Sequence, residues 1–217
     1  SYVSYKGESL SYKLDGNPFS YIHILNPEFN KESKSAPFSN DLFRNIRLKF
    51  EEFVDKGNFI QDEEESLYLY RQEKQDRVFV GLITLVSVDD YHAGKILKHE
   101  ETIARREERF IRYLDITNIH AEPVLLNYPD IPQIEQLMQE VQLEDYEYNF
   151  TTVDEANHKL WKISDPEQIA TVKESFASVE HLYIADGHHR CSSSALLAKE
   201  RSDKNIKDCA NYFMSML

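Results

Sequence analysis

The chain has 217 residues, of which 41% are hydrophobic and 12% aromatic, so it can bury a core and is not intrinsically disordered. Its net charge of −13 argues against broad electrostatic binding to DNA or to an anionic membrane. No apolar stretch is long enough to cross a membrane, no signal peptide is recognisable, and two cysteines do not make a disulfide framework. We therefore expect a globular protein of the reducing cytoplasm. Because the chain lacks an initiator Met and stops in mid-pattern, we expect residues 1–217 to be a single module from a longer protein.

The N-terminal part predicts one short strand and one amphipathic helix. The strand is expected at Tyr21 to Leu25 and is followed by a polar loop. Asn40 is the predicted N-cap of the helix, and Gly57 is its predicted stop. Its apolar residues recur at helical spacing and are Phe43, Ile46, Phe50, Phe53 and Val54.

The middle of the chain predicts a hairpin followed by alternating helices and strands. The two hairpin strands are "LYLYR" and "RVFVGLITLVSV", which are rich in aromatic and β-branched residues. A helix is expected from about Gly94 to Tyr113. It is followed by a buried strand in "EPVLLNY" and a helix with Pro132 at its first position.

The C-terminal part predicts a second hairpin, a helix and a strand. The hairpin joins "YEYNFTTV" to "HKLWKIS", and Asp165-Pro166 is a strong helix start. The strand "HLYIA" then leads into an Ala/Leu-rich helix whose helix formers follow Ser192, and His188, His189 and Arg190 are expected on the strand-to-helix loop or in the first helical turn. Two hairpins among intermingled helices predict an α+β (mixed α/β) fold, with an antiparallel-containing sheet and flanking helices.

The most distinctive chemistry lies in "DGHHR", which separates this last strand from the last helix. Backbone N–H groups at a helix start suit an anion, and the planar fork of Arg190 can hold two phosphate oxygens. Gly187 permits a positive φ, and His188 or His189 can donate a hydrogen bond or transfer a proton. Asp186 can orient a histidine or hold a metal together with a phosphate.

The hydroxyl of Ser192 is a further candidate ligand for the same anion. The alternative to a binding site is that Asp-Gly forms a common turn and that the histidines are ordinary surface residues. A structural zinc site has weaker support, because no CxxC or HxxxH spacing accompanies the motif.

A second cluster lies in "KILKHEETIARREER", on the helix expected at 94–113. His99, Thr102 and Arg106 are spaced to share one polar face, and Glu100 is a candidate general base. The alternative is an exposed helix with surface ion pairs. No Walker-type loop, G-x-S-x-G or G-x-G-x-x-G occurs, so several common nucleotide-binding and hydrolase classes are excluded.

Four segments in order resemble the domain-of-unknown-function 1015 family: "VGLITLVSVDDYHAGKILKHEET", "EPVLLNYPD", "HKLWKISDP" and "LYIADGHHR". The resemblance runs from about residue 15 to the end of the chain. The DGHHR loop is also similar to the loop of the ParB/sulfiredoxin-like superfamily, which includes ParB, sulfiredoxin, and free-serine kinases that use ADP or ATP. Because that loop contacts nucleotide phosphates in those relatives, the resemblance implies that residues 186–190 form a phosphate-binding loop.

Two functions follow from these residues and this resemblance. The first is phosphotransfer from ADP or ATP, with Mg²⁺, to a small hydroxylated metabolite such as free serine. In this reaction His188 or His189 would stabilise the transferred group, and Glu100 would accept the hydroxyl proton. The second is a nucleotide-binding regulatory module without turnover. DNA binding by analogy with ParB is disfavoured by the acidic charge and by the absence of a helix-turn-helix pattern. The oligomeric state is left open.

Overall fold

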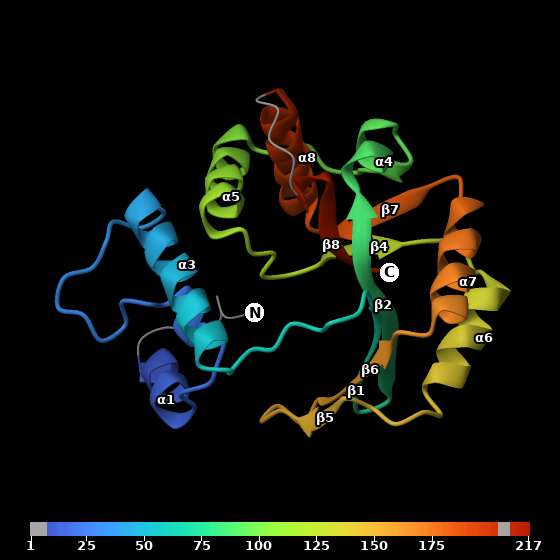
Figure 1. Cartoon of the computed structure of the whole chain (residues 1–217), viewed down its shortest axis with the longest axis horizontal. Helices are drawn as coiled ribbons and strands as arrows, with labels where there is room; N and C mark the ends of the chain where they lie inside the picture. The colour runs from blue at the N-terminus through green and yellow to red at the C-terminus, as the bar shows by residue number, and fades with distance from the viewer. Residues whose placement is uncertain (1–7, 204–208) are drawn as a thin grey trace. The chain divides into compact units, whose positions relative to one another are not determined.

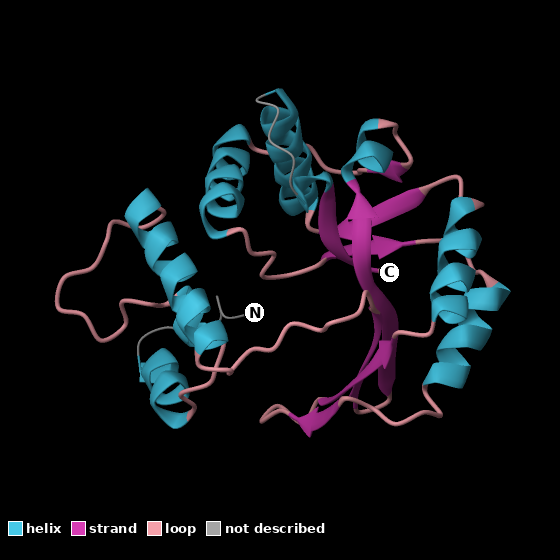
Figure 2. Cartoon of the chain, in the orientation of Figure 1, coloured by secondary structure: helices cyan, strands magenta, loops and turns pink. Residues whose placement is uncertain are grey.

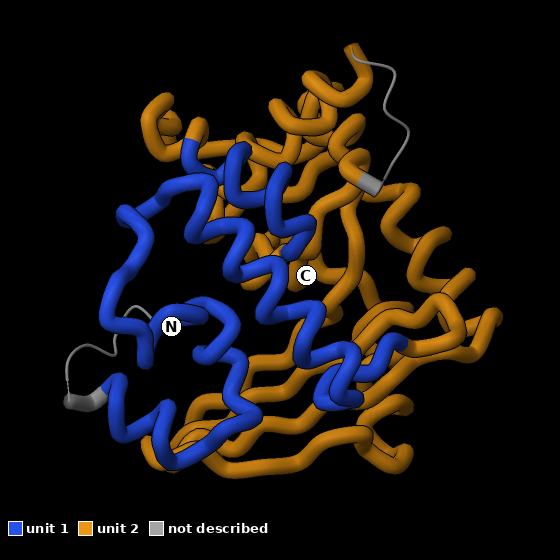
Figure 3. Tube along the Cα trace, turned by 60° about the vertical axis from the view of Figure 1, so that its left-hand side comes forward, with its two compact units in different colours: residues 1–61, 109–119 blue, residues 62–108, 120–217 orange. Residues whose placement is uncertain are grey.

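The structure is a computed structural model that describes residues 8–203 and 209–217. The chain forms two compact units, shown in Figure 3. Unit 1 comprises residues 1–61 and 109–119, and unit 2 comprises residues 62–108 and 120–217. Helix α5 (Ala104–Thr117) therefore begins in unit 2, and its remaining turns belong to unit 1.

Unit 1 is helical and has its own small core. It contains α1 (Glu8–Gly16), α2 (Ile22–Leu25), α3 (Asn40–Asp55) and most of α5. Its buried apolar residues are Ile24, Phe43, Ile46, Phe53 and Ile119. The strand predicted at Tyr21 to Leu25 was wrong, because this segment forms α2. The hydroxyl of Ser20 accepts a hydrogen bond from the Ile22 N–H at 3.3 Å, a local bond that favours a turn or helix start over a strand.

Helix α3 has the predicted stop and a cap one residue earlier than predicted. Ser39, not Asn40, is the N-cap, since its hydroxyl accepts from the Leu42 N–H at 3.2 Å. At the other end Gly57 has φ +70, and its N–H donates to the Val54 carbonyl, which confirms the glycine stop. Three of the five predicted apolar residues are buried, whereas Val54 is exposed.

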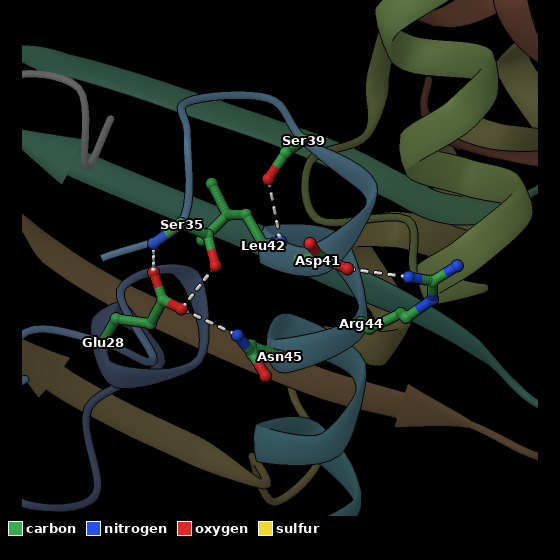
Figure 4. A network of polar contacts seen from close by, with 7 residues as sticks. All are labelled: Glu28, Ser35, Ser39, Asp41, Leu42, Arg44 and Asn45. Atoms are coloured by element: carbon green, nitrogen blue, oxygen red, sulfur yellow. Dashed lines mark hydrogen bonds and ion pairs between the residues drawn. The ribbon is translucent and has the colours of Figure 1, made fainter. Parts of the chain in front are cut away.

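A carboxylate fastens the polar loop before α3. Glu28 is buried and accepts three hydrogen bonds, from the N–H and hydroxyl of Ser35 and from the Asn45 amide, at 2.7–2.8 Å. Figure 4 shows these bonds beside the Ser39 cap. The same bonds, those of Ser35 first, lower the pKa of Glu28, so the loop is held by an ionised group.

Unit 2 is built on an eight-stranded mixed sheet, with the strands in the order β3-β7-β4-β8-β2-β1-β6-β5. Its strands are drawn as arrows in Figure 1 and in magenta in Figure 2. Pairs β3–β7 and β4–β8 are parallel and the other pairs are antiparallel, which confirms the α+β class and both predicted hairpins, β1–β2 and β5–β6. The strands are β1 (Leu67–Lys74), β2 (Arg77–Ser87), β3 (Ile96–Leu97), β4 (Val124–Asn127), β5 (Tyr148–Thr151), β6 (Asn157–Ile163), β7 (Leu182–Asp186) and β8 (Tyr212–Met216).

The helices of unit 2 bury one continuous core against this sheet. They are α4 (Val88–His92), α6 (Pro132–Val141), α7 (Pro166–Ala177), α8 (His188–Asp203) and the 3-10 turn η2 (Cys209–Asn211). Helices α6 and α7 lie side by side (Figure 1). Their Ile134, Leu137 and Val172 join the sheet residues Leu69 and Trp161 in the core. As predicted, Asp165 caps α7, and Pro166 follows it.

Two expectations for unit 2 were incomplete or wrong. The helix predicted from Gly94 to Tyr113 begins ten residues later than expected, at Ala104, because Ile96–Leu97 pair with β7 as strand β3. Residues 98–103 form the loop between β3 and α5. The segment "YFMSM" was not predicted as a strand, yet it forms β8 between β4 and β2. No helix within residues 8–203 and 209–217 is both long and apolar enough to span a bilayer.

Candidate functional site

The DGHHR motif forms the junction between β7 and α8, with Asp186 as the last residue of the strand. Gly187 follows with φ +98, a left-handed conformation that favours glycine. The first intrahelical hydrogen bond of α8 runs from the Cys191 N–H to the Gly187 carbonyl at 3.0 Å. The N–H groups of the three preceding residues, 188–190, therefore have no acceptor within the helix and form its positive end.

The helix begins at His188, so His188, His189 and Arg190 lie in its first turn, which is one of the two places predicted for them. Ser192, Ser193 and Ser194 are buried in its second turn and do not cap it. The Ser194 hydroxyl donates to the Arg190 carbonyl at 2.9 Å, which satisfies it inside the helix. Gly187 is the physical reason for this start, since it turns the chain out of the strand at once.

Arg190 is paired within the junction. Its guanidinium donates to the Asp186 carboxylate and to the Pro123 carbonyl, and it lies 3.6 Å from the Glu122 carboxylate. It also folds over Gly187, where an added Cβ would lie 3.1 Å from its Cζ, Nε and Nη2 atoms. Two acceptors of the protein itself, the Asp186 carboxylate and the Pro123 carbonyl, therefore already occupy part of this fork.

His188 is buried, with 7% of its side chain exposed, and contacts the loop between β3 and α5. Its ring meets the His99 ring edge to face, with centroids 4.4 Å apart. Its Nε2 accepts a long hydrogen bond of 3.5 Å from the His99 N–H, so the neutral ring carries its proton on Nδ1. That Nδ1 faces the Glu100 carboxylate at 4.0 Å. Burial, and secondarily His99, lower the pKa of His188, which favours the neutral ring.

A second polar cluster, which the sequence did not reveal, surrounds Glu107 in the first turn of α5. One carboxylate oxygen of Glu107 accepts hydrogen bonds from the Thr102 hydroxyl, at 2.6 Å, and from the Ser192 hydroxyl. These bonds, that of Ser192 first, lower the pKa of Glu107, and the nearby His189 and Lys98 act in the same direction. No local pattern links Ser192 to Glu107, because 85 residues separate them.

The structure thus brings together most of the predicted site, but through different geometry. His99 and Glu100 reach His188 from a loop and not from a helix face. Arg106, expected on the same helix face as His99, lies within α5, while His99 precedes that helix. His189 lies beside this cluster, and its Nδ1 is buried without a hydrogen-bond partner in the described structure.

Metal ligands are not clustered in the described part of the chain. Within residues 8–203 and 209–217, no group of three or more His, Cys, Asp or Glu side chains is arranged to hold a metal ion. Cys191, which directly follows the motif, is fully buried, and burial raises the pKa of its thiol to about 12. Its thiol is therefore protonated at neutral pH.

Comparison with known proteins identifies the family of the chain and nothing narrower. No curated protein and no solved structure matches it. The model of one family, described as a protein of unknown function (DUF1015), matches residues 1–217 and so spans both units. The similarity of the DGHHR loop to the ParB/sulfiredoxin-like superfamily stays a prediction. The chain belongs to the DUF1015 family.

Proposed function

We propose that the protein binds a small phosphate-bearing ligand, with ADP and ATP as the first candidates, at the start of α8. One observation carries the proposal: the left-handed Gly187 begins the helix so abruptly that three N–H groups and the Arg190 guanidinium belong to the same turn. Oriented N–H groups and a guanidinium are the donors that phosphate oxygens prefer. The resemblance of the DGHHR loop to nucleotide-binding loops supports the same ligand class.

The charges around this turn favour a phosphate that arrives with a divalent cation. Four carboxylates contact or neighbour the turn, whereas the cations are Lys98 and Arg190, and His188 is held neutral. The carboxylates are Glu100, Glu107, Glu122 and Asp186. Mg²⁺ binds phosphates together with one or two carboxylates, and the side chains of Glu100 and Asp186 are 68% and 73% exposed. Because no described cluster could hold a metal alone, the ion would enter with the nucleotide.

In the catalytic form of the proposal, the protein is a phosphotransferase for a small hydroxylated metabolite such as free serine. The acceptor oxygen forms a bond to the terminal phosphorus of the nucleotide, and the bond from that phosphorus to the leaving phosphate oxygen breaks. Glu100 takes the hydroxyl proton, and His188 beside it stabilises the transferred group. Arg190 and the N–H groups of the turn hold the negative oxygens, so positioning and charge supply most of the catalysis.

One observation favours the alternative, a nucleotide-binding regulatory module without turnover. Glu100 is well exposed, and its carboxylate lies 4.0 Å from His188, too far for a hydrogen bond. No contact in the described residues therefore fixes it as a base. The two forms share the binding turn and differ only in product formation.

Thermal melting tests the binding step. Wild-type protein is melted with ADP, ATP, CTP or inorganic phosphate, each with MgCl₂ or with EDTA. A ligand at a hundred times its Kd stabilises the folded state by about 2.7 kcal/mol, which raises the Tm of a protein of this size by about 5–11 °C. We expect this shift for Mg²⁺–nucleotide and a smaller one with EDTA.

Two arginine variants decide whether the site is the one proposed. Arg190→Ala should abolish the ligand-induced shift, measured against its own ligand-free Tm. Arg44→Ala, which removes a similar Arg–Asp pair on α3, should keep it. An equal shift in both variants would contradict the proposal. Phosphoserine formation, followed by mass spectrometry over a panel of hydroxylated acceptors, then separates the enzyme from the regulatory module.

A further inference from the structure

We infer that Glu107 is a positioning residue, whose carboxylate holds the loop 98–103, with His99 and Glu100, against the first turn of α8. The effect of Glu107 on ligand binding rests on the proposed nucleotide site. Its effect on the position of the loop can be tested without any ligand.

The bonds of Glu107 join the two segments that make the site. Thr102, in the loop, and Ser192, in α8, donate to the same carboxylate oxygen. The Ser193 hydroxyl adds a bond of 3.3 Å to the Glu107 main-chain carbonyl. Ser192 and Ser193 are buried, so solvent competes less for their bonds to Glu107. The side chain of Glu107 thus fastens the loop to the second turn of α8, and its main-chain carbonyl adds a bond to the same turn.

The direct polar contacts between the loop and α8 are weaker. The His99 N–H reaches His188 at 3.5 Å, and the Glu100 carboxylate lies 4.0 Å from it, distances at which a hydrogen bond or ion pair contributes little. The Thr102 bond to Glu107 measures 2.6 Å and, like the Ser192 bond, has an ionised acceptor, which makes this connection the stronger one. The position of His99 over the His188 ring therefore depends on Glu107, although Glu107 touches neither ring in any described hydrogen bond.

Histidine NMR tests the structural part. In Glu107→Ala we expect loss of the NOE between the His99 and His188 rings. We also expect the pKa of His188 to rise toward its ordinary value, because the loop moves away and water reaches the ring. The other titrating groups that act on this ring are His99, Glu100, Asp186 and His189. Glu107→Gln keeps an oxygen acceptor for both hydroxyls and should restore the NOE.

The matched control is Glu101→Ala. Glu101 lies in the same loop and is 92% exposed, with only a 3.6 Å contact to Lys98. The Glu101→Ala variant should leave both the NOE and the His188 titration unchanged. An unchanged NOE in Glu107→Ala would overturn the inference.

Thr102→Val provides a second test in case Glu107→Ala does not fold. It removes only the loop side of the connection and leaves the Ser192 bond to Glu107 in place. We expect the NOE to be lost with a small change in Tm, and a retained NOE would again contradict the inference.

Nucleotide binding tests the functional part. If wild type binds Mg²⁺–ATP, Glu107→Ala and Thr102→Val should weaken the affinity by about tenfold or more, because the binding groups are no longer held in place. Unchanged affinity after loss of the NOE would overturn the functional part. If wild type binds no nucleotide while the NOE still depends on Glu107, the proposed function fails and the positioning role of Glu107 stands.

Discussion

Gly187 combines two properties that no other residue supplies at the β7–α8 junction. Its φ of +98 lies in the left-handed region, and the Arg190 guanidinium lies where a Cβ would need space. The residue therefore sets both the start of α8 and the path of the arginine that is proposed to bind phosphate.

Gly187→Ala should lower the free energy of unfolding by about 1–3 kcal/mol, because alanine is strained at this φ. Chemical denaturation measures the loss. Gly16→Ala is the control, since Gly16 has no positive φ and nothing within 4 Å of an added Cβ. Equal stability changes in the two variants would show that the left-handed turn is not required.

His188 should make stability depend on pH in a defined direction. Its pKa in the folded state is lowered, mainly by burial, below the value of about 6.5 that a histidine has in an unfolded chain. The unfolded state therefore binds more protons, and stability falls as the pH is lowered from 7 through this window, by at most about 1.4 kcal/mol per pH unit for one proton.

The comparison is with His188→Gln, which keeps an acceptor for the His99 N–H but does not titrate. Denaturation curves between pH 7 and 5 should show a steeper loss in wild type than in the variant. The neighbouring Glu100, Asp186, His99 and His189 are present in both proteins, so the difference reports His188 together with its coupling to these groups. Parallel curves would mean that His188 is solvated in the folded state.

At the scale of elements, the start of α3 shows what decides a helix boundary. Ser39 and Asn40 are both good capping residues, and the sequence alone favoured Asn40. Ser39 has the extended backbone of a cap, with φ −76 and ψ 159, and its hydroxyl reaches the Leu42 N–H (Figure 4). Asn40 is the first residue of the helix.

Ser39→Ala should therefore cost about 1 kcal/mol of stability, while Asn40→Ala should be neutral or slightly stabilising, since alanine is the better helix former. Urea denaturation of the two variants measures this. The reverse order would place the cap at Asn40.

Elements defined by local patterns were predicted well, and those defined by distant pairing were not. The β1–β2 hairpin, the Asp165-Pro166 start of α7 and the Gly57 stop of α3 each depend on residues within a few positions of one another. Strand β3 instead depends on pairing with β7, more than eighty residues later, and "KILKHEE" has enough helix formers to favour a helix without that pairing.

At the scale of the molecule, the described residues bury two separate apolar cores, one in each unit. Because each core stabilises its own unit, unfolding need not follow a single two-state transition. The family match spans both units, so both belong to the family module.

Two core variants test this independence by hydrogen exchange. Phe43→Ala in unit 1 should cost about 3–5 kcal/mol locally and raise amide exchange in α3 and in residues 109–119. Leu126→Ala in unit 2 should raise exchange in the sheet and leave α3 protected. If either variant accelerated exchange equally throughout the described residues, the two units would form one cooperative structure.

The amino-acid sequence by itself determined the α+β class, both hairpins, the capped helix α7 and the place of Asp186 to Arg190 between a strand and a helix. All of these follow from propensity, periodicity and turn chemistry, which act over a few residues. Only the tertiary structure revealed that Arg190 is paired with Asp186 and Pro123, that His99 covers His188, and that Glu107 joins Thr102 to Ser192. Most of these contacts join residues far apart in the chain, and such contacts form because strand pairing and core burial bring distant segments together, which no local pattern encodes.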